Sequence, residues 1–299
     1  MYPKISIITP NFNQGKYIEE TILSIINQGY PNLEYIIIDG GSTDNSVEII
    51  EKYDKHISYW VSEKDKGQAD AINKGLAHCT GEIFNWINSD DLLAPNALFT
   101  IASLYKENAT VAGRVYNFYE NNSELNDYTQ NENLDFLNFL MLKSVYHQPG
   151  IWLNLKHIKG LYLDTENHYY FDLFFYINHF KNNKEIIYTD NILAHFRFHS
   201  ESKTTLIQNK SQTEIIQFYQ GLYHAKDYRP QRRLIRKVLK YFEANKEIKR
   251  WLEMPAEQKN RINFFKFFTS NLSYLEVNVF WKFIIKYMIN FQNIRIKHH

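Results

Sequence analysis

Three clusters of polar and acidic residues in the first hundred residues of the chain have the composition of a binding site. They are Pro10–Asn13, Asp39–Asp44 and Asn88–Asp91, and each comes directly after an apolar run. Two adjacent carboxylates at the end of a strand, Asp90 and Asp91, suit Mg²⁺ or Mn²⁺, which prefer oxygen ligands and keep coordination positions open for phosphate. The same pair is also typical of a helix N-terminus, where an acid caps the first turn and meets the positive end of the dipole.

The elements that must position these clusters follow from the spacing of the apolar residues. Near-continuous apolar runs predict strands buried on both faces, and apolar positions at helical spacing between them predict helices. The predicted strands cover 4–9, 33–38 and 82–87, and the predicted helices cover 16–28, 45–53 and 68–77. This alternation indicates βαβ units, in which ligands bind at the carboxyl ends of the strands. We therefore expect the three clusters to meet at one edge of the sheet, although another Rossmann-like domain would share the pattern.

Length and composition indicate the number of domains and the cellular compartment. A chain of 299 residues can form one large domain or one domain with an appendage. The single cysteine, Cys79, leaves no disulfide framework within the chain and fits a reducing cytosol. We expect no signal peptide, because Met1 leads almost directly into a strand, and no transmembrane helix, because no apolar run reaches about 18 residues. The sequence thus predicts a cytoplasmic protein.

Charge is distributed unevenly along the chain. Residues 221–299 contain 17 Lys and Arg against 6 Asp and Glu, a net of +11, which leaves a net of −10 for residues 1–220. Helical patterns in and just before the basic part cover 211–223, 229–251 and 262–291. We therefore predict a catalytic domain over 1–205 and a basic, aromatic-rich helical region over 206–299.

The basic region combines positive charges with aromatic side chains. They are Arg232, Arg233, Arg236, Lys237 and Lys240, followed by Phe264, Phe265, Phe267, Phe268, Trp281, Phe283 and Tyr287 close to Lys266, Lys282 and Lys286. Helices on an anionic membrane surface have this composition. So does a helical appendage that packs its aromatics on the catalytic domain and keeps its charges in water. The acidic remainder of the chain argues against nucleic acid as a partner.

Four motifs in order carry a resemblance to a known family. They are Thr9–Asn13, Asp39–Asp44, Asp65–Gly75 and Trp86–Asp91. Together they closely resemble glycosyltransferase family 2, and the resemblance, of the bacterial polysaccharide type, covers roughly residues 3–205. It implies the α/β GT-A fold, a Rossmann-like mixed sheet flanked by helices, here with a C-terminal helical extension. It also implies inverting transfer of a sugar from a nucleotide diphosphate.

The resemblance assigns the first half of the chain to the donor. The implied nucleotide-binding residues are Thr9, Pro10, Asn13, Asp39, Lys66, Asp70, Lys74, Asn88 and Ser89. Asp90 matches the last acid of the family's Asp-x-Asp motif and is the expected ligand of Mn²⁺ or Mg²⁺. Asn88 stands where the first acid is common, and one charge fewer should weaken metal affinity. For Asp91 we favour a cap on the following helix.

The second half must supply a base and an acceptor site. Inverting transfer needs one carboxylate within hydrogen-bond reach of the acceptor hydroxyl. Asp172 lies in a segment that resembles the family segment carrying that acid, and we take it as the candidate base. Glu166 and Asp164 are its competitors, and Glu166 is also a candidate acceptor-binding residue. Trp152 either stacks on an acceptor sugar or belongs to the core.

A late segment supplies positive charge for the leaving group. Arg197, His199 and Lys203 resemble the family's Arg-x-His segment and the Ser-Lys-Thr-like turn after it, which implies diphosphate binding. Charge stabilisation of this kind is often the largest catalytic contribution. His199 is also a candidate metal ligand.

The resemblance implies a hexosyl- or N-acetylhexosaminyl-transferase that takes its sugar from a nucleotide diphosphate, with UDP as the expected nucleotide. The expected acceptor is a glycan or lipid-linked glycan in cell-surface polysaccharide synthesis, which would place the protein in the cytoplasm or on the inner face of the membrane. A nucleotidyltransferase would need a Gly-rich basic loop in place of Pro10–Asn13, and an oxidoreductase would need Gly-x-Gly-x-x-Gly there. A catalytically silent sugar-nucleotide binder or scaffold remains an alternative, supported by Asn88.

Overall fold

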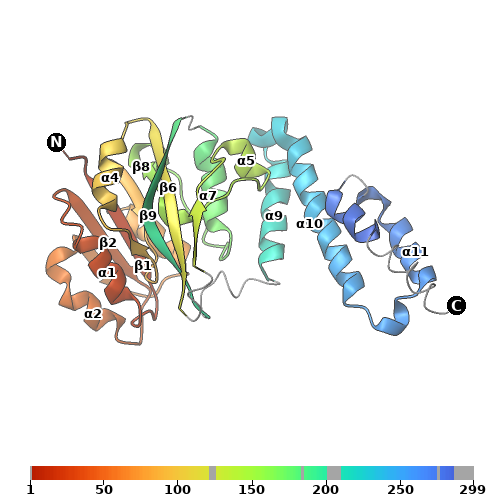
Figure 1. Ribbon diagram of the computed structural model, residues 1–299, viewed down its shortest axis with the longest axis horizontal. Helices are drawn as coiled ribbons and strands as arrows, with labels where there is room; N and C mark the ends of the chain where they lie inside the picture. The colour runs from red at the N-terminus through yellow and green to blue at the C-terminus, as the bar shows by residue number, and fades with distance from the viewer. Residues whose placement is uncertain (1, 121–125, 183–184, 201–209, 275–276, 286–299) are drawn as a thin grey trace. The chain divides into compact units, whose positions relative to one another are not determined.

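The computed structural model describes residues 2–120, 126–182, 185–200, 210–274 and 277–285 (Figure 1). The chain forms two compact units, residues 1–211 and residues 212–299. The predicted boundary at 205/206 falls within 201–209, outside the described residues.

The first unit is built on a mixed nine-stranded sheet in the order β3-β2-β1-β4-β8-β6-β9-β5, with β7 paired to β6. The strands are β1 (Ile5–Asn11), β2 (Leu33–Asp39), β3 (Tyr59–Ser62), β4 (Ile83–Trp86), β5 (Leu92–Leu93), β6 (Ala109–Tyr119), β7 (Asp127–Gln130), β8 (Ile151–Asn154) and β9 (Glu185–Phe198). The first four strands pair in parallel, and β8 joins them to β6 through antiparallel pairings. The predicted mixed sheet is confirmed.

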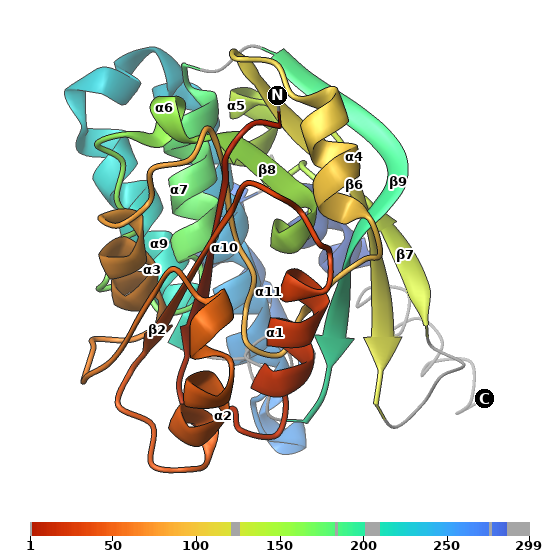
Figure 2. The same ribbon diagram turned by 90° about the vertical axis from the view of Figure 1, so that its left-hand side faces the viewer.

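Helices cover both faces of the sheet (Figure 2). They are α1 (Ile18–Ile26), α2 (Ser46–Lys52), α3 (Gln68–Leu76), α4 (Ala97–Leu104), α5 (Phe136–Leu140), α6 (Leu155–Ile158) and α7 (Phe171–Phe180). Side chains alternate between the faces of a strand, so β1 directs Ile5 and Ile7 to one face and Ile8 to the other. Ile5 and Ile7 share a core with α1, α2 and α4. Gly75 brings α3 against Ile8, since a Cβ on Gly75 would lie 2.8 Å from the Ile8 side chain.

The register of the sheet brings the polar clusters together. Asn11 at the end of β1 pairs with Asp39 at the end of β2, and Ile8 pairs with Trp86 at the end of β4. The segments that follow these strands therefore emerge at one edge. The prediction that the three clusters share an edge of the sheet is confirmed.

Two long strands complete that edge. β6 and β9 run in parallel, with register shifts around Arg114, and pair as far as Tyr119 and Phe198. Glu120 and His199 are the next residues along the chain, so both reach the edge at which the polar clusters meet.

The second unit is helical. Its elements are α9 (Lys210–His224), which begins at the boundary, α10 (Arg232–Leu252), α11 (Arg261–Ser270) and a helical run over 278–285. The predicted helix over 262–291 is interrupted, because Asn271 ends α11 and its side-chain amide donates to the Phe267 carbonyl at 2.8 Å. Residues 286–291 of that prediction lie outside the described residues. No helix in the described part of the chain is long and apolar enough to cross a membrane.

Candidate active site

The loops after β1 and β2 are bound to each other. The backbone N–H of Asn13 donates to the Ser42 hydroxyl at 2.8 Å, and the Asn13 side-chain oxygen accepts from the Thr43 N–H at 2.8 Å. Gly15 N–H donates to the Asp44 carboxylate at 2.8 Å. Asn13 adopts a left-handed conformation, with φ of 52°. Two loops far apart in the sequence thus form one polar surface.

Asp39 is fully buried beneath this surface. Its carboxylate accepts hydrogen bonds from the side chains of Asn11, Ser42 and Ser62, and from the backbone N–H groups of Gly41 and Ser42. Burial raises the pKa of Asp39, but the hydrogen bonds outweigh it and the pKa is lowered overall. The ionised carboxylate therefore organises the loop that follows β2.

Thr9 and Pro10 are buried, whereas Asn13 is exposed. The Thr9 hydroxyl accepts from the hydroxyl of Tyr35 at 3.1 Å. Its side chain therefore belongs to the strand packing, and of these three predicted donor residues Asn13 has the exposed position.

The loop before α3 carries the predicted lysines and an acid. Gly67 precedes the helix with φ of +112°, which favours glycine, and its N–H donates to Asp65. Asp70 accepts from the backbone N–H of Lys66 at 3.0 Å and lies 3.9 Å from the ammonium of Lys74, which pairs with Glu63 at 2.7 Å. These bonds fix the conformation of the loop before α3.

Asn88 and Asp91 stabilise the turn that contains Asp90. The Asn88 side chain accepts from Gln68 at 2.6 Å and donates to Asp91 at 3.0 Å. Ser89 is buried, and its carbonyl accepts from the Thr21 hydroxyl at 2.9 Å. Asn88 thus links this turn to α3.

The expectation that Asp91 caps the following helix is wrong. Helix α4 begins only at Ala97, after Asn96, and the two-residue strand β5 intervenes. Asp91 is buried and accepts the backbone N–H of Arg197 at 3.1 Å. Burial and the charge of Asp90 hold the pKa of Asp91 well above its ordinary value. Asp91 therefore ties the Asp90 turn to β9.

Asp90 and His199 meet at the polar edge. The imidazole Nε2 of His199 lies 3.0 Å from Oδ2 of Asp90. The Asp90 side chain is 22% exposed, whereas that of His199 is 2% exposed. The two predicted metal ligands are thus brought together, and the carboxylate keeps access to solvent.

Arg197 lies behind this pair, in a network of polar and aromatic contacts. Its Nε donates to the Asp90 carbonyl at 2.9 Å, and its terminal nitrogens contact Glu20 at 2.5 Å and Glu120 at 3.4 Å. The guanidinium also lies 4.9 Å from the ring centroid of Tyr17 and 4.7 Å from that of Phe118. With its side chain 8% exposed, Arg197 holds the Asp90 backbone, and its contact with a diphosphate stays a prediction.

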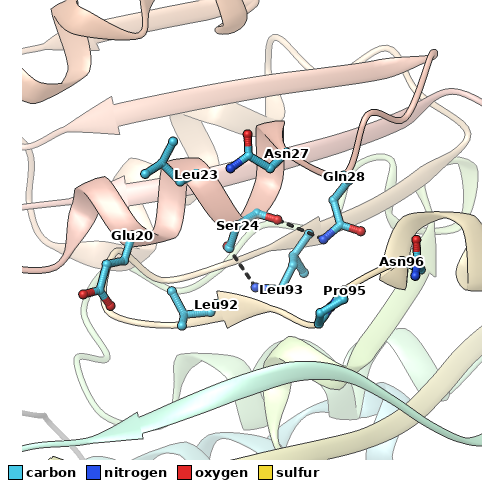
Figure 3. Close-up of a pocket in the computed structure, with 9 residues that line it drawn as sticks. All are labelled: Glu20, Leu23, Ser24, Asn27, Gln28, Leu92, Leu93, Pro95 and Asn96. Atoms are coloured by element: carbon cyan, nitrogen blue, oxygen red, sulfur yellow. Dashed lines mark hydrogen bonds between the residues drawn. The ribbon is translucent and has the colours of Figure 1, made fainter.

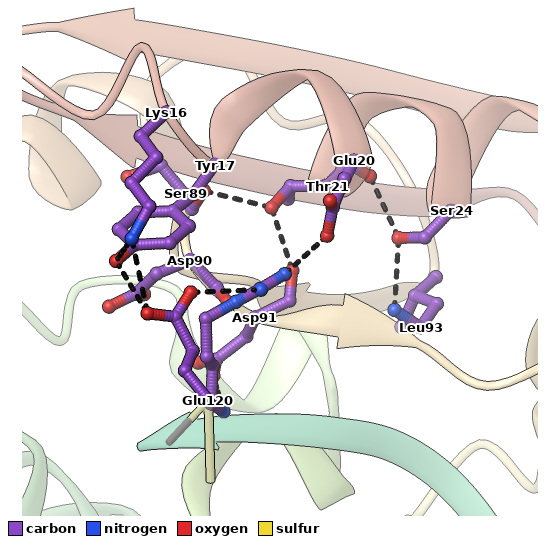
Figure 4. Close-up of polar contacts among 11 residues, drawn as sticks. Lys16, Tyr17, Glu20, Thr21, Ser24, Ser89, Asp90, Asp91, Leu93 and Glu120 are labelled. Atoms are coloured by element: carbon purple, nitrogen blue, oxygen red, sulfur yellow. Dashed lines mark hydrogen bonds and ion pairs between the residues drawn. The ribbon is translucent and has the colours of Figure 1, made fainter. Parts of the chain in front are cut away.

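Glu120 joins this network to the start of α1. Its carboxylate lies 3.1 Å from the Lys16 ammonium and 3.2 Å from the Tyr17 hydroxyl, and Figure 4 shows these groups beside Asp90 and Asp91. The Tyr17 ring lies 4.7 Å from that of His199. Lys16 is thereby the exposed cation of this group.

Asp172 lies in the first turn of α7. Its carboxylate accepts from the backbone N–H of Leu173 at 2.7 Å and from the Tyr146 hydroxyl at 3.4 Å. Burial raises the pKa of Asp172 to about 6, although these hydrogen bonds act in the opposite direction. The group is therefore ionised at neutral pH yet basic enough to accept a proton.

Aromatic packing holds α7 against the end of β4. The Trp86 ring lies 5.9 Å from that of Phe175 and 6.2 Å from that of Tyr176, one turn after Asp172. Gln148 donates to the Trp86 carbonyl at 2.9 Å, which anchors the segment that carries Tyr146. Thus β4, the strand that leads to the Asp90 turn, also positions the helix that carries Asp172.

The remaining predicted residues of the second half differ in burial and contacts. Trp152 is 1% exposed on β8 and belongs to the core, so the sugar-stacking role is wrong for it. Asp164 accepts hydrogen bonds from the Glu166 N–H and the Asn167 side chain within its own turn. Glu166 is exposed. Lys203, the third predicted diphosphate ligand, lies outside the described residues.

A family model described as glycosyl transferase family 2 matches residues 6–181. The chain belongs to glycosyl transferase family 2. It is 31% identical over 153 residues to the glycosyltransferase GlyG of Streptococcus pneumoniae serotype 4, covering 50% of this chain and 51% of GlyG. It is 38% identical over 94 residues to TuaG of Bacillus subtilis, named for teichuronic acid biosynthesis, covering 30% of this chain and 36% of TuaG. The match thus spans about half of GlyG and about a third of TuaG.

Solved structures support the GT-A fold of this family 2 member. Residues 1–349 of TarS from S. aureus, in complex with UDP-GlcNAc, superpose with a TM-score of 0.64 at 17% identity, covering 91% of this chain and 81% of that one. The mannosyltransferase PcManGT from Pyrobaculum calidifontis, in complex with GDP-Man and Mn²⁺, gives 0.52 at 16% identity, with coverages of 97% and 87%. At these identities the likeness shows the fold alone.

Two side chains of the site suit a divalent cation. Asp90 and His199 supply one carboxylate and one imidazole, a donor set that Mn²⁺ accepts. In the described residues no group of three or more His, Cys, Asp and Glu side chains could hold a metal. The remaining positions would therefore belong to the donor diphosphate and water, as is usual for Mg²⁺ and its relatives.

One hollow of the first unit lies apart from the predicted site residues. An open depression of about 460 Å³ lies between α1 and β5, and Figure 3 shows its nine lining residues. They are Glu20, Leu23, Ser24, Asn27, Gln28, Leu92, Leu93, Pro95 and Asn96. None of the predicted donor, metal or base residues is among them, so this hollow is not the predicted site.

Sequence reasoning missed three residues that shape the site. Glu120 had a usable signal, because it follows the apolar strand β6 just as the first three polar clusters follow their strands. Lys16 and Tyr146 had none, since their positions depend on Glu120 and Asp172, which are far away in the sequence.

Proposed function

We propose that this family 2 protein is an inverting glycosyltransferase that moves a sugar from a nucleotide diphosphate to a hydroxyl of a glycan or lipid-linked glycan. The observation that carries the proposal is the Asp90–His199 pair beside the loops around Asn13 and Asp39 at one sheet edge. The carboxylate of Asp172, whose pKa is about 6, supports it from α7, which packs on Trp86 of β4, the strand that leads to the Asp90 turn. UDP-GlcNAc in TarS and GDP-Man in PcManGT support a nucleotide-sugar donor, and we favour UDP.

The chemistry is a single displacement. The acceptor oxygen forms a bond to the anomeric carbon while the bond from that carbon to the diphosphate breaks, and the configuration inverts. Asp172 accepts the acceptor proton and later releases it to water, a role for which a pKa near the working pH is suited. A bound Mn²⁺ or Mg²⁺ would offset the charge on the departing diphosphate.

The chain's own residues prepare this step. Asp39 orders the nucleoside loop, Asn88 fixes the Asp90 turn against α3, and Arg197 holds the Asp90 carbonyl. The Tyr146 hydroxyl orients the Asp172 carboxylate. We place the reaction in the cytoplasm in the synthesis of cell-surface polysaccharide, in line with the name of TuaG.

The test is binding and turnover of a panel of nucleotide sugars with Mn²⁺ in three proteins: wild type, Asp90→Ala and Asp172→Asn. We expect one donor to bind wild type in a metal-dependent way, to lose that binding in Asp90→Ala, and to bind Asp172→Asn without turnover. Hydrolysis unaffected by Asp172→Asn would move the base to Glu166 or Asp164. Binding without turnover in wild type would favour a silent sugar-nucleotide binder.

A further inference from the structure

Two short helices of the second unit share one buried core. Phe264 of α11 packs on Trp251 of α10, with ring centroids 5.5 Å apart, and Phe267 lies 6.0 Å from Phe280 of the helical run over 278–285. Phe280 and Ile284 are also buried. These aromatic side chains thus belong to the unit's own core.

The opposite face of each helix carries a different set of side chains. On α11, Ile262 and Phe265 are 70% and 66% exposed beside the exposed Lys266. On 278–285, Trp281 and Ile285 are 43% and 52% exposed beside the exposed Lys282. Their spacings of three and four residues place each apolar pair on one helix face. We use the term outward face for these six exposed residues, of which each of the two helices on the shared core contributes two apolar side chains and one lysine.

Single exposed apolar residues are common, but a pattern repeated on two helices next to positive charge is not. Residues 221–299 carry a net charge of +11. Lys266 and Lys282 stand beside the exposed apolar side chains of their own helices, so each helix offers apolar insertion together with attraction to anions. Amphipathic helices that lie in an anionic membrane surface combine these two properties.

We propose that the outward face binds an anionic membrane surface, with Phe265 and Trp281 entering the headgroup layer and the lysines at the lipid phosphates. A second copy of the chain is the less suitable occupant. Four such side chains offer on the order of 600 Å², less than the about 800 Å² that each partner usually contributes to a stable protein interface. The proposal stands whether or not the proposed transfer reaction is correct.

The test is co-sedimentation of the full-length protein with two kinds of vesicle, phosphatidylcholine mixed with phosphatidylglycerol and phosphatidylcholine alone. We expect binding to the mixed vesicles only, weakened by salt. Phe265→Asp with Trp281→Asp, and separately Lys266→Glu with Lys282→Glu, should each lower the partition coefficient about tenfold or more.

Two control variants lie in the first unit. Tyr162 is 73% exposed and Lys55 is exposed, so Tyr162→Asp and Lys55→Glu make the same kinds of change at one position each and should leave binding unchanged. Equal binding to both vesicles, no binding by wild type, or equal losses in the control variants would overturn the proposal. So would a wild-type dimer in light scattering that Phe265→Asp converts to a monomer.

Discussion

Replacing Asp172 by Asn should make the protein more stable at neutral pH while abolishing sugar transfer. The substitution keeps the shape of the side chain, and the Asn oxygen can still accept the Leu173 N–H that Asp172 accepts at 2.7 Å. It removes a negative charge from surroundings that raise the pKa of that carboxyl from 3.8 to about 6. A base that is costly to ionise is useful in catalysis and unfavourable for folding.

The magnitude follows from the shift in pKa. A pKa raised by about two units means that ionising Asp172 costs the folded state about 3 kcal/mol more than the unfolded chain. The folded state favours the neutral form of Asp172. Its contribution to the free energy of unfolding is therefore fully present below about pH 4 and is lost as the pH rises through about 6. Asp172 is partly exposed, and solvent screening reduces this cost. We therefore expect Asp172→Asn to raise the free energy of unfolding by about 1–3 kcal/mol at pH 7.5 and by almost nothing near pH 4.

The assay is urea denaturation of the full chain, followed by tryptophan fluorescence at both pH values. Asp164→Asn is the matched control, because Asp164 is exposed and accepts hydrogen bonds only within its own turn in the described structure. Its unfolding free energy should change by no more than about 0.5 kcal/mol at either pH. Equal stability of wild type and Asp172→Asn at pH 7.5, or a gain that persists at pH 4, would refute the reasoning.

Three further predictions concern the same unit. The ratio kcat/KM for transfer should rise with pH through an apparent pKa of about 6 and level off above it, because Asp172 must be ionised to accept a proton; a flat pH–rate profile from 5 to 8 would contradict this. Arg197→Met should lower the free energy of unfolding by about 1–3 kcal/mol and should weaken Mn²⁺ binding in calorimetry. The control is Glu20→Gln, at a side chain that is 61% exposed, which should change the free energy of unfolding by less than about 1 kcal/mol. Trp152→Ala should cost about 3–5 kcal/mol of unfolding free energy, while the milder Trp152→Phe should leave the KM for acceptor unchanged because Trp152 is buried.

The parts of the fold that depend on local pattern could be predicted from the sequence. The apolar runs over 4–9, 33–38 and 82–87 became β1, β2 and β4, and the helical spacings between them became helices within two residues of the predicted ends. The shared edge followed from a rule about parallel strands, which needs no knowledge of side-chain contacts. Asp90 and His199 came together as the family resemblance implied.

The features that could not be predicted depend on contacts between segments that are distant in the sequence. Asp91 resembles a helix cap in sequence, but the Arg197 N–H of β9 binds it instead, and β9 was not predicted as a partner of that turn. Trp152 could not be separated from a sugar platform until the structure placed β8 between β4 and β6, with the Trp152 side chain packed in the hydrophobic core. The two ion pairs of Arg197 could not be predicted either, because its carboxylate partners come from α1 and from the end of β6.

The most direct test of the central claim is the anomeric configuration of the transferred sugar, observed by NMR immediately after reaction of an α-linked nucleotide sugar with wild-type protein. An inverting displacement with Asp172 as base predicts a β-linked product or β-anomer, and loss of its formation in Asp172→Asn. A product that retains the α configuration would contradict the account, as would β-product formed at the wild-type rate by Asp172→Asn.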